Sequence, residues 1–210
     1  MSRPEWFIWD LGNVVIKLAW SRVEEAIIAR SSRNPESLRS IIEGPGGYRD
    51  MESGKVSFAE LFSLLREEGG YRGDLESFRA IWSDFFDGTV DGIVPLIDQT
   101  RKLYRIAFLS NSNEVHEDVI PRQFPQVFRP GDRLILSHRE RSAKPEERIF
   151  QRALEILDAR AADCIFVDDV AENVATAQRM GFRAFLFSSV AQLITDLQKN
   201  ELLPPLEHLT

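Results

Sequence analysis

Several acidic, hydroxyl, amide and basic side chains come just after short apolar segments of the sequence. They are Asp10, Ser110, Asn111, Asp168 and Asp169, and Lys144 comes some way after the third such segment. Parallel strands end at a common edge of their sheet, and ligands of open sheets collect there. If the apolar segments are such strands, these groups meet at one edge. Together they suit the binding of a divalent cation and a phosphate group.

The three aspartates require a compensating charge if they lie close together. Like charges at short range push the pKa of one carboxyl group upward. A hard divalent cation resolves the conflict, and Mg²⁺ takes one or two carboxylates, a carbonyl, waters and a substrate phosphate. We therefore expect Mg²⁺ as the cofactor, held by Asp10, Asp168 and Asp169.

The remaining groups can hold and attack the phosphate. Ser110, Asn111 and Lys144 offer hydrogen-bond donors to its oxygens, because phosphoryl transfer depends on positioning and charge neutralisation. Asp10 keeps one oxygen free to attack phosphorus, which predicts an aspartyl-phosphate that water then hydrolyses. Each residue also has a purely structural interpretation, as a turn, a cap or a helix-terminal charge. Asn173 either orients the acid pair or faces solvent.

The apolar segments predict the elements that carry these residues. The expected strands are Trp6–Trp9, Ile106–Leu109, Leu134–Leu136, Cys164–Val167 and Phe182–Phe187. They are short and continuously apolar, as buried strands of a parallel sheet are. Helical patterns over Glu146–Leu157 and Val170–Met180 separate the later strands. This alternation predicts an α/β protein with a doubly wound, mostly parallel, Rossmann-like sheet of five strands or more.

Nearly a hundred residues separate the first two strands, far more than one crossover requires. Four helices are expected there, over Ser21–Ser31, Pro35–Glu43, Ser57–Glu68 and Leu75–Phe86. Gly-rich breaks such as GPGGY divide them. The sequence thus predicts a core domain of residues 1–16 and 90–210 with an inserted helical cap of residues 17–89. The cap is expected to close by hinging near Val15–Ala19 and Asp87–Gly92.

Four segments resemble, in order, the motifs of the haloacid dehalogenase-like hydrolases. They are FIWDLGNVV, FLSNSN, SAKPEERIF and IFVDDVAEN, and the resemblance spans roughly residues 5–190. It implies that Asp10 is the nucleophile, Ser110 binds phosphate and Lys144 stabilises the phosphoryl oxygens. It also implies Mg²⁺ ligation by the acid pair, with Asp169 the direct ligand.

Gly12 departs from the usual first motif of that family, DxDxT or DxDxV. The second aspartate of the motif serves as general acid and base, which contributes about 10²–10⁴ in rate. Gly12 retains only a main-chain carbonyl as a metal ligand. The DLGNV form and YRDMESGKVS resemble a subgroup that includes bacterial α-D-glucose-1-phosphate phosphatases. A sugar phosphate is therefore the expected substrate, with Tyr48 and Arg49 as contacts in a Gly-rich break.

Two other functions are compatible with this scaffold. Metal-free 2-haloacid dehalogenases also lack the second aspartate, but they resemble one another in carrying neutral residues where this chain has Asp168 and Asp169. A non-catalytic binding or regulatory protein is supported only by Gly12. The nucleophile, the lysine and the acid pair favour a phosphatase over both alternatives.

Bulk composition limits the partners and the compartment. The net charge of −7 argues against nucleic acid as the main partner but allows a small phosphorylated metabolite. No apolar run is long enough for a membrane span or a signal-peptide core, and the single cysteine, Cys164, excludes an intrachain disulfide. We expect a cytoplasmic monomer or weak homodimer, with Cys164 buried. His116, His138 and His208 are expected at the surface.

Overall fold

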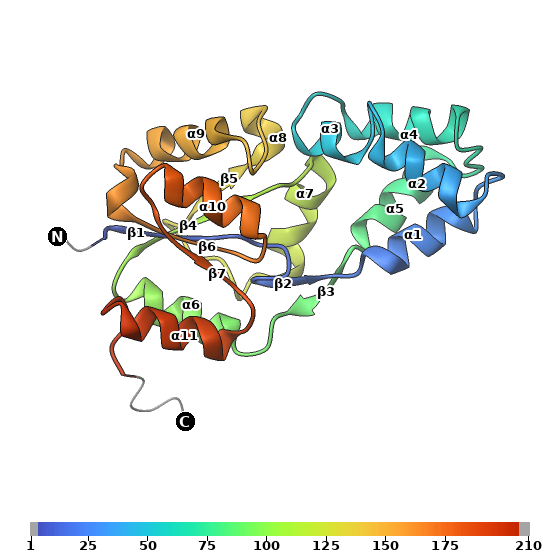
Figure 1. The fold of residues 1–210 in the computed structure, drawn as a ribbon. Helices are drawn as coiled ribbons and strands as arrows, with labels where there is room; N and C mark the ends of the chain where they lie inside the picture. Colours follow the sequence, from blue (N-terminus) through green and yellow to red (C-terminus); the bar gives the residue numbers. More distant parts are fainter. Residues whose placement is uncertain (1–3, 206–210) are drawn as a thin grey trace.

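Five short parallel strands form the central sheet of the molecule. The structure is a computed structural model that describes residues 4–205. The strands are β1 (Trp6–Trp9), β4 (Arg105–Ser110), β5 (Arg133–Leu136), β6 (Cys164–Asp168) and β7 (Arg183–Leu186), in the order β5-β4-β1-β6-β7 (Figure 1). Every neighbouring pair is parallel. This confirms the predicted fold class.

Helices cover both faces of this sheet. Successive side chains of a strand point to opposite faces, so a continuously apolar strand has residues to bury on each face. On one face Trp6 and Ile8 pack with α9 (Glu147–Leu157) and α10 (Ala171–Arg179). On the other face Phe7 and Trp9 pack with α6 (Ile93–Arg101) and α11 (Val190–Lys199) (Figure 1). The other elements of this part are α7 (Glu114–Gln123), α8 (Ser137–Glu140) and the 3₁₀ turn η1 (Ala161–Asp163).

The register of the sheet aligns the ends of its three central strands. Trp9, the last residue of β1, pairs with Phe108 on β4 and with Val167 on β6. The Asp10 main-chain N–H then donates to the Val167 carbonyl at 2.9 Å. The residues that follow these strands therefore emerge at one edge of the sheet.

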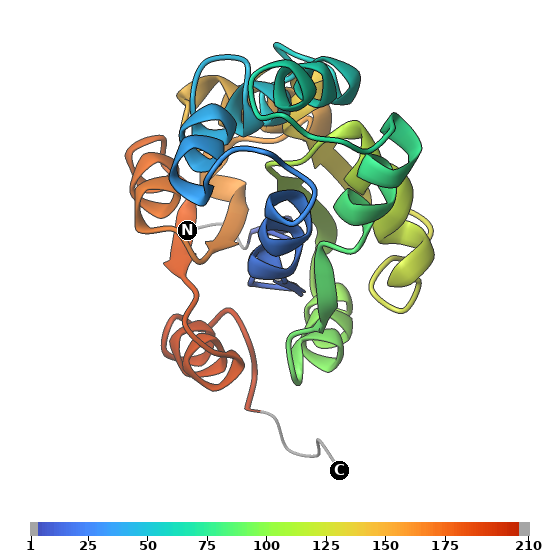
Figure 2. The same cartoon turned by 90° about the vertical axis from the view of Figure 1, so that its right-hand side faces the viewer.

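The inserted helices are joined to the sheet through a two-stranded antiparallel ribbon. Its strands are β2 (Ile16–Leu18) and β3 (Phe86–Thr89). Between them lie α1 (Trp20–Ile28), α2 (Pro35–Glu43), α3 (Tyr48–Glu52), α4 (Phe58–Glu67) and α5 (Leu75–Ser83). These helices lie to one side of the sheet in Figure 1 and face the viewer in Figure 2.

Local sequence explains where three of the inserted helices begin. Asn34 caps α2 with its side-chain oxygen, and Pro35 follows at the first helical position. Ser57 and Glu60 form a capping box at α4, and Asp74 caps α5. Each cap satisfies main-chain N–H groups that have no partner within the helix.

Three sequence expectations in this region differ from the structure. The helix expected over 75–86 ends at Ser83, because Phe86 begins the strand that pairs with β2. The helix expected over 21–31 ends at Ile28. The Gly-rich break contains a short helix, α3, which begins directly after Gly47.

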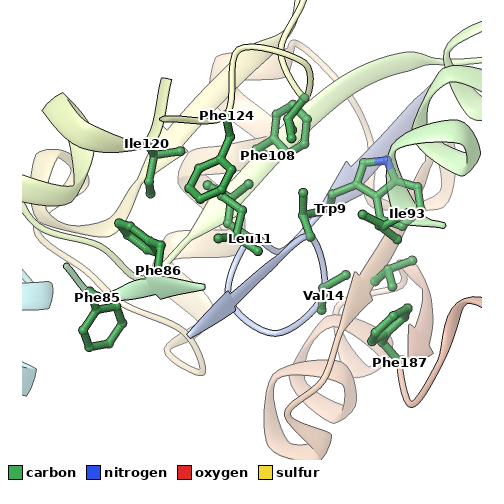
Figure 3. Close-up of a cluster of buried hydrophobic side chains, with 14 of the residues drawn as sticks. Trp9, Leu11, Val14, Phe85, Phe86, Ile93, Phe108, Ile120, Phe124 and Phe187 are labelled. Atoms are coloured by element: carbon green, nitrogen blue, oxygen red, sulfur yellow. The ribbon is translucent and has the colours of Figure 1, made fainter. Parts of the chain in front are cut away.

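A continuous apolar cluster connects the sheet with the ribbon. In Figure 3, Leu11 lies between Trp9 of β1 and the group formed by Phe86, Ile120 and Phe124. The side chains of this cluster are almost fully buried. Within residues 4–205, the helices all fall short of the length and hydrophobicity required to cross a bilayer.

Candidate active site

Lys144 lies at the centre of a buried cluster of charges. Its Nζ donates to Asp10 Oδ1 at 2.6 Å, to Asp168 Oδ2 at 2.7 Å and to the Leu109 carbonyl at 3.0 Å. The Lys144 side chain is 2% exposed, so water contributes little to solvating its charge. These contacts join the ends of β1, β4 and β6 through one ammonium group.

Burial and charge act against each other at Asp10 and Lys144. Burial raises the pKa of Asp10 to about 7; Lys144 opposes this shift, while Asp168 and Asp169 add to it. Burial also disfavours the Lys144 ammonium, but attraction to Asp10 and Asp168 holds the pKa of Lys144 above its ordinary value. Two acids around one lysine leave an excess of negative charge, which favours a cation.

The two acids after β6 have different surroundings. Asp168 is fully buried: its Oδ1 accepts from Val170 N at 2.8 Å and from Asn173 Nδ2 at 2.9 Å, and its Oδ2 accepts from Lys144. Asp169 is half-buried and lines the adjacent cavity. Burial, followed by repulsion from Asp168, raises the pKa of Asp169. Asn173 thus contacts Asp168 instead of facing solvent. Of the two carboxylates, that of Asp169 is the more exposed.

The Asn111 side chain fixes the loop that carries Lys144. Its Oδ1 accepts from Lys144 N at 2.8 Å, and its Nδ2 donates to the Lys144 carbonyl at 2.9 Å. Asn111 therefore acts on the neighbouring main chain in addition to lining the cavity. Ser110, at the end of β4, is buried and its hydroxyl donates to the Asn111 carbonyl at 3.2 Å.

Gly12 lies on the tight turn that follows Asp10. Its carbonyl accepts from Val14 N at 2.7 Å, which leaves the second lone pair of that oxygen for another partner. Gly12 also lines the cavity. A Cβ atom at this position would lie 3.0 Å from Leu18 Cδ1, so the ribbon approaches the turn closely.

A cavity of about 200 Å³ opens above these groups. From the sheet edge it is lined by Asp10, Ser110, Asn111, Lys144 and Asp169. From the inserted segment it is lined by Leu18, Tyr48, Glu52, Phe85 and Phe86. A wider hollow of about 610 Å³ shares Leu18, Tyr48, Glu52 and Phe85 with it and extends to Trp20, Ile42 and Arg49.

The two predicted contact residues of the insert occupy different positions. Tyr48 is half-buried and lines both the inner cavity and the outer hollow. Arg49 is exposed and lines the outer hollow without reaching the inner cavity. Both belong to α3, so the expectation of a loop at this point was wrong.

The prediction that the histidines are surface residues is wrong for His116. His116 is 3% exposed, and its Nδ1 lies 3.0 Å from Asn113 Nδ2. Its ring packs against Phe85 and Phe86, and burial lowers its pKa to about 3. His138 is half-buried, with Nε2 3.0 Å from Glu117 Oε2. His208 lies outside the described residues.

Cys164 has the environment of an unreactive thiol. It is buried in β6, and burial raises its pKa to about 12. Since the thiolate is the nucleophile, a thiol that remains protonated has no catalytic use.

Three further residues at the cavity were not predicted as site residues. Asn13 hydrogen-bonds to Asp169, Ser112 lines the cavity beside Ser110, and Glu52 brings a carboxyl group from α3. Glu52 lies in the segment YRDMESGKVS, but nothing in its spacing indicates that α3 faces the sheet edge. Contacts between distant parts of the chain bring these residues to the site.

Known proteins match this chain over most of its length. A family model for haloacid dehalogenase-like hydrolases matches residues 5–181. The D-ribitol-5-phosphate phosphatase of Bacteroides thetaiotaomicron is 24% identical over 183 residues, covering 85% of this chain and 89% of that protein. A phosphatase of Mycobacterium tuberculosis is 27% identical and covers 88% of each.

A solved structure gives the same picture of the fold. A magnesium complex of a HAD family enzyme from Bacteroides thetaiotaomicron superposes with a TM-score of 0.76 at 25% identity, covering 90% of this chain and 96% of that one. The same enzyme has also been crystallised with magnesium and inorganic phosphate. The match extends over the sheet and the inserted helices alike.

Proposed function

The chain belongs to the haloacid dehalogenase-like hydrolase family, and we propose that it is a Mg²⁺-dependent phosphatase that cleaves a small phosphate ester by attack of Asp10. One observation carries the proposal. Carboxylate oxygens of Asp10, Asp168 and Asp169 lie within 4.8 Å of one another, next to the buried ammonium of Lys144. Both sequence relatives described above are phosphatases, which supports the same chemistry.

The residues present fit a magnesium ion. All the available donors are oxygens, namely the carboxylates of Asp10 and Asp169 and the carbonyl of Gly12, and hard cations prefer such donors. Asp168 holds Lys144 through Oδ2 and accepts two hydrogen bonds at Oδ1, so Asp168 Oδ2 keeps one lone pair for the ion. A bound Mg²⁺ would neutralise the carboxylates and the charge of the substrate phosphate.

The protein residues have separate tasks in this reaction. One Asp10 oxygen attacks phosphorus, and the ester oxygen leaves on the opposite side. Lys144 neutralises charge at the phosphoryl oxygens, and the Ser110 hydroxyl donates to one of them. Asn111 keeps Lys144 in place through its main chain. Water then cleaves the aspartyl-phosphate and frees Asp10.

The lining of the cavity favours a polyhydroxylated substrate. The outer hollow presents the rings of Trp20, Tyr48 and Phe85 together with the polar groups of Glu52 and Arg49. Aromatic faces and hydrogen-bonding side chains suit the carbon and hydroxyl faces of a sugar. We assign a small sugar or sugar-alcohol phosphate as the substrate class, of which glucose 1-phosphate and ribitol 5-phosphate are examples.

In this proposal residues 17–89 form the cap, and residues 1–16 and 90–210 form the core. The β2–β3 ribbon connects the two, and its strands overlap the expected hinge segments Val15–Ala19 and Asp87–Gly92. Tyr48 and Glu52 of α3, together with Leu18 and Phe86 of the ribbon, line the cavity from the inserted segment. Closure of the cap excludes water from the phosphate during attack.

The acid pair after β6 separates this function from the alternatives. A 2-haloacid dehalogenase has no need of a cation and therefore no use for the Asp10–Asp168–Asp169 group. A binding protein has no use for a free carboxylate beside a buried lysine. We therefore give preference to the phosphatase.

A panel of phosphate esters tests the proposal, with sugar and sugar-alcohol phosphates assayed first for released phosphate. We expect turnover that EDTA abolishes and Mg²⁺ restores, and none from Asp10→Asn. Asp158→Asn, on the far end of α9, is the matched control and should retain full activity. Hydrolysis of 2-haloacids in EDTA, or release of phosphate by Asp10→Asn at the wild-type rate, would exclude the proposed mechanism.

A further inference from the structure

The turn after the nucleophile lacks the second acid of the usual first motif. Gly12 stands where a second aspartate would supply a proton to the leaving group, and it has no side chain. Alkoxide ions of sugars and sugar alcohols are poor leaving groups. Protonation of such an oxygen contributes about 10²–10⁴ to the rate. If the proposed function holds, another residue must therefore deliver this proton.

In-line attack determines where that residue has to lie. The attacking and leaving oxygens are on opposite sides of phosphorus. Because Asp10 attacks from the sheet edge, the leaving oxygen points toward the inserted helices. Among the described residues of that segment that line the inner cavity, Tyr48 and Glu52 have a proton to transfer.

We propose that Glu52, on α3 of the cap, is the general acid that protonates the leaving oxygen and then the general base that activates water. This residue takes over both tasks of the aspartate that Gly12 replaces. The inference rests on the proposed phosphatase function and extends it to a residue of the cap.

Contacts with the core fix the position of Glu52. The Ser137 hydroxyl donates to the Glu52 carbonyl, and its oxygen accepts from Ser112 N at 2.9 Å. A Cβ atom at Gly54 would lie 2.2 Å from the His138 carbonyl oxygen, so the chain after α3 packs directly on α8. The loop after β4, which carries Ser112, is thereby tied to the residue that we assign to the leaving group.

The surroundings of the Glu52 carboxyl group suit proton transfer near neutral pH. Burial raises its pKa from 4.5 to about 7, although a hydrogen bond from Tyr48 and the charges of Lys144 and Arg49 act in the opposite direction. Asp10, His116 and Asp169 line the inner cavity together with Glu52. Asp50, Lys55, Glu146 and Glu172 line a second hollow with it, and Glu43 lines the outer hollow. A general acid works best when its pKa is near the working pH.

Tyr48 is the weaker candidate for the acid. Burial raises its pKa well above 10, so its hydroxyl gives up a proton with difficulty at neutral pH. Its hydrogen bond to Glu52 instead orients the carboxyl group and leaves the second oxygen to carry the proton. Tyr48 is thus a positioning residue for Glu52.

The two half-reactions balance. In the first, the bond between Asp10 Oδ and phosphorus forms, the ester P–O bond breaks, and the Glu52 proton moves to the leaving oxygen to give an alcohol. In the second, Glu52 carboxylate takes a proton from water as the water oxygen attacks phosphorus. The Asp10–phosphorus bond breaks, and inorganic phosphate and protonated Glu52 result.

Single-turnover cleavage of two esters by the full-length Mg²⁺ enzyme tests this role in Glu52→Gln. One ester is the alkyl phosphate that wild type cleaves fastest, and the other is 4-nitrophenyl phosphate, whose leaving group requires no proton. We expect Glu52→Gln to slow the alkyl ester by about 10²–10⁴ and the nitrophenyl ester by less than about tenfold. Glu67→Gln, exposed on α4 of the same cap, should match wild type on both.

The pH dependence provides a second readout. Since the pKa of Glu52 is raised, its acid form persists to neutral pH and is lost above about 7. The nucleophile Asp10 also has a pKa raised to about 7, and it is present in both enzymes. The readout is therefore the ratio of the wild-type rate to the Glu52→Gln rate on the alkyl ester, which should fall as the pH rises through that value.

Three results would overturn the inference. Equal loss on both esters would make Glu52 a structural or binding residue, and undiminished cleavage of the alkyl ester would remove any role in proton transfer. A wild-type enzyme that cleaves neither ester would refute the proposed phosphatase and this inference together, so the two failures can be told apart.

Discussion

At the scale of single residues, the buried ammonium of Lys144 makes the site possible. It lies within 2.7 Å of both Asp10 and Asp168, which could not otherwise face each other as carboxylates in a dry environment. Asn111 hydrogen-bonds to the main chain of Lys144, and Asn173 hydrogen-bonds to its partner Asp168. The site thus combines the positively charged ammonium of Lys144 with carboxylates that can also bind a metal cation.

Lys144→Met tests this role. Removing the Lys144 charge leaves the buried carboxylates of Asp10 and Asp168 uncompensated and lowers the free energy of unfolding by about 3–5 kcal/mol. Loss of one electrostatic stabiliser of the transition state lowers kcat by about 10²–10³. Urea denaturation and steady-state kinetics measure the two effects. Lys102→Met, at an exposed lysine, should change neither, and a fully active Lys144→Met would show that this ammonium is dispensable.

Some of these residues could be inferred from the sequence and others could not. Asp10, Ser110 and Asp168 follow apolar strands directly, so their arrival at one sheet edge is predictable. The hydrogen bonds of Asn111 to Lys144 span 33 residues and have no local pattern. His116 is buried because cap aromatics cover it, and sequence spacing does not reveal that contact.

At the scale of elements, hydrophobic pattern and capping residues predict the helices and strands that local sequence defines. The strands that form only by pairing across the insert are not predictable in this way. The strand Trp6–Trp9 and the helix Pro35–Glu43 have the bounds expected from apolar runs and from the Asn34–Pro35 start. The strands β2 and β3 are only three and four residues long and pair with each other across the whole insert, so neither stands out. The helices α6, α7 and α11 were not assigned from sequence.

Ser57→Ala tests the contribution of capping to the cap helices. The Ser57 hydroxyl accepts from Glu60 N at 3.2 Å, and this capping box closes the first turn of α4. Loss of such a cap costs about 1 kcal/mol, which urea denaturation detects. Ser63→Ala, within the same helix, should change stability by less than about 0.5 kcal/mol. Equal effects of the two variants would show that the capping box adds nothing.

At the scale of the whole molecule, the inserted segment meets the rest of the chain through the ribbon, through ring contacts of Phe85 and Phe86 with His116, and through a few hydrogen bonds. Glu114 Oε1 accepts from Phe58 N at 3.0 Å, and Ser137 contacts the Glu52 carbonyl. The presence of several helices between the first strand and β4 was readable from the length of the insert, but the facing of α3 toward the sheet edge was not. That arrangement depends on contacts between α3 and α8.

We predict that the cap closes further when the phosphate site is filled. Small-angle scattering should give a smaller radius of gyration with Mg²⁺ and beryllium fluoride than in their absence, because the ligand draws α3 toward Asp10. Asp10→Asn, which cannot bond to beryllium, should show no such change. Identical scattering curves for wild type with and without the ligand would rule out closure.

The whole account depends on the Asp10 carboxylate as the group that accepts phosphorus. A crystal structure of the protein with Mg²⁺ and beryllium fluoride measures this most directly. We predict a trifluoroberyllate bonded to an Asp10 oxygen, with Lys144 and Ser110 on its fluorine atoms and the Glu52 carboxyl group on the side opposite Asp10. An empty site beside Asp10, or a fluoride complex bound to any other residue, would contradict the account.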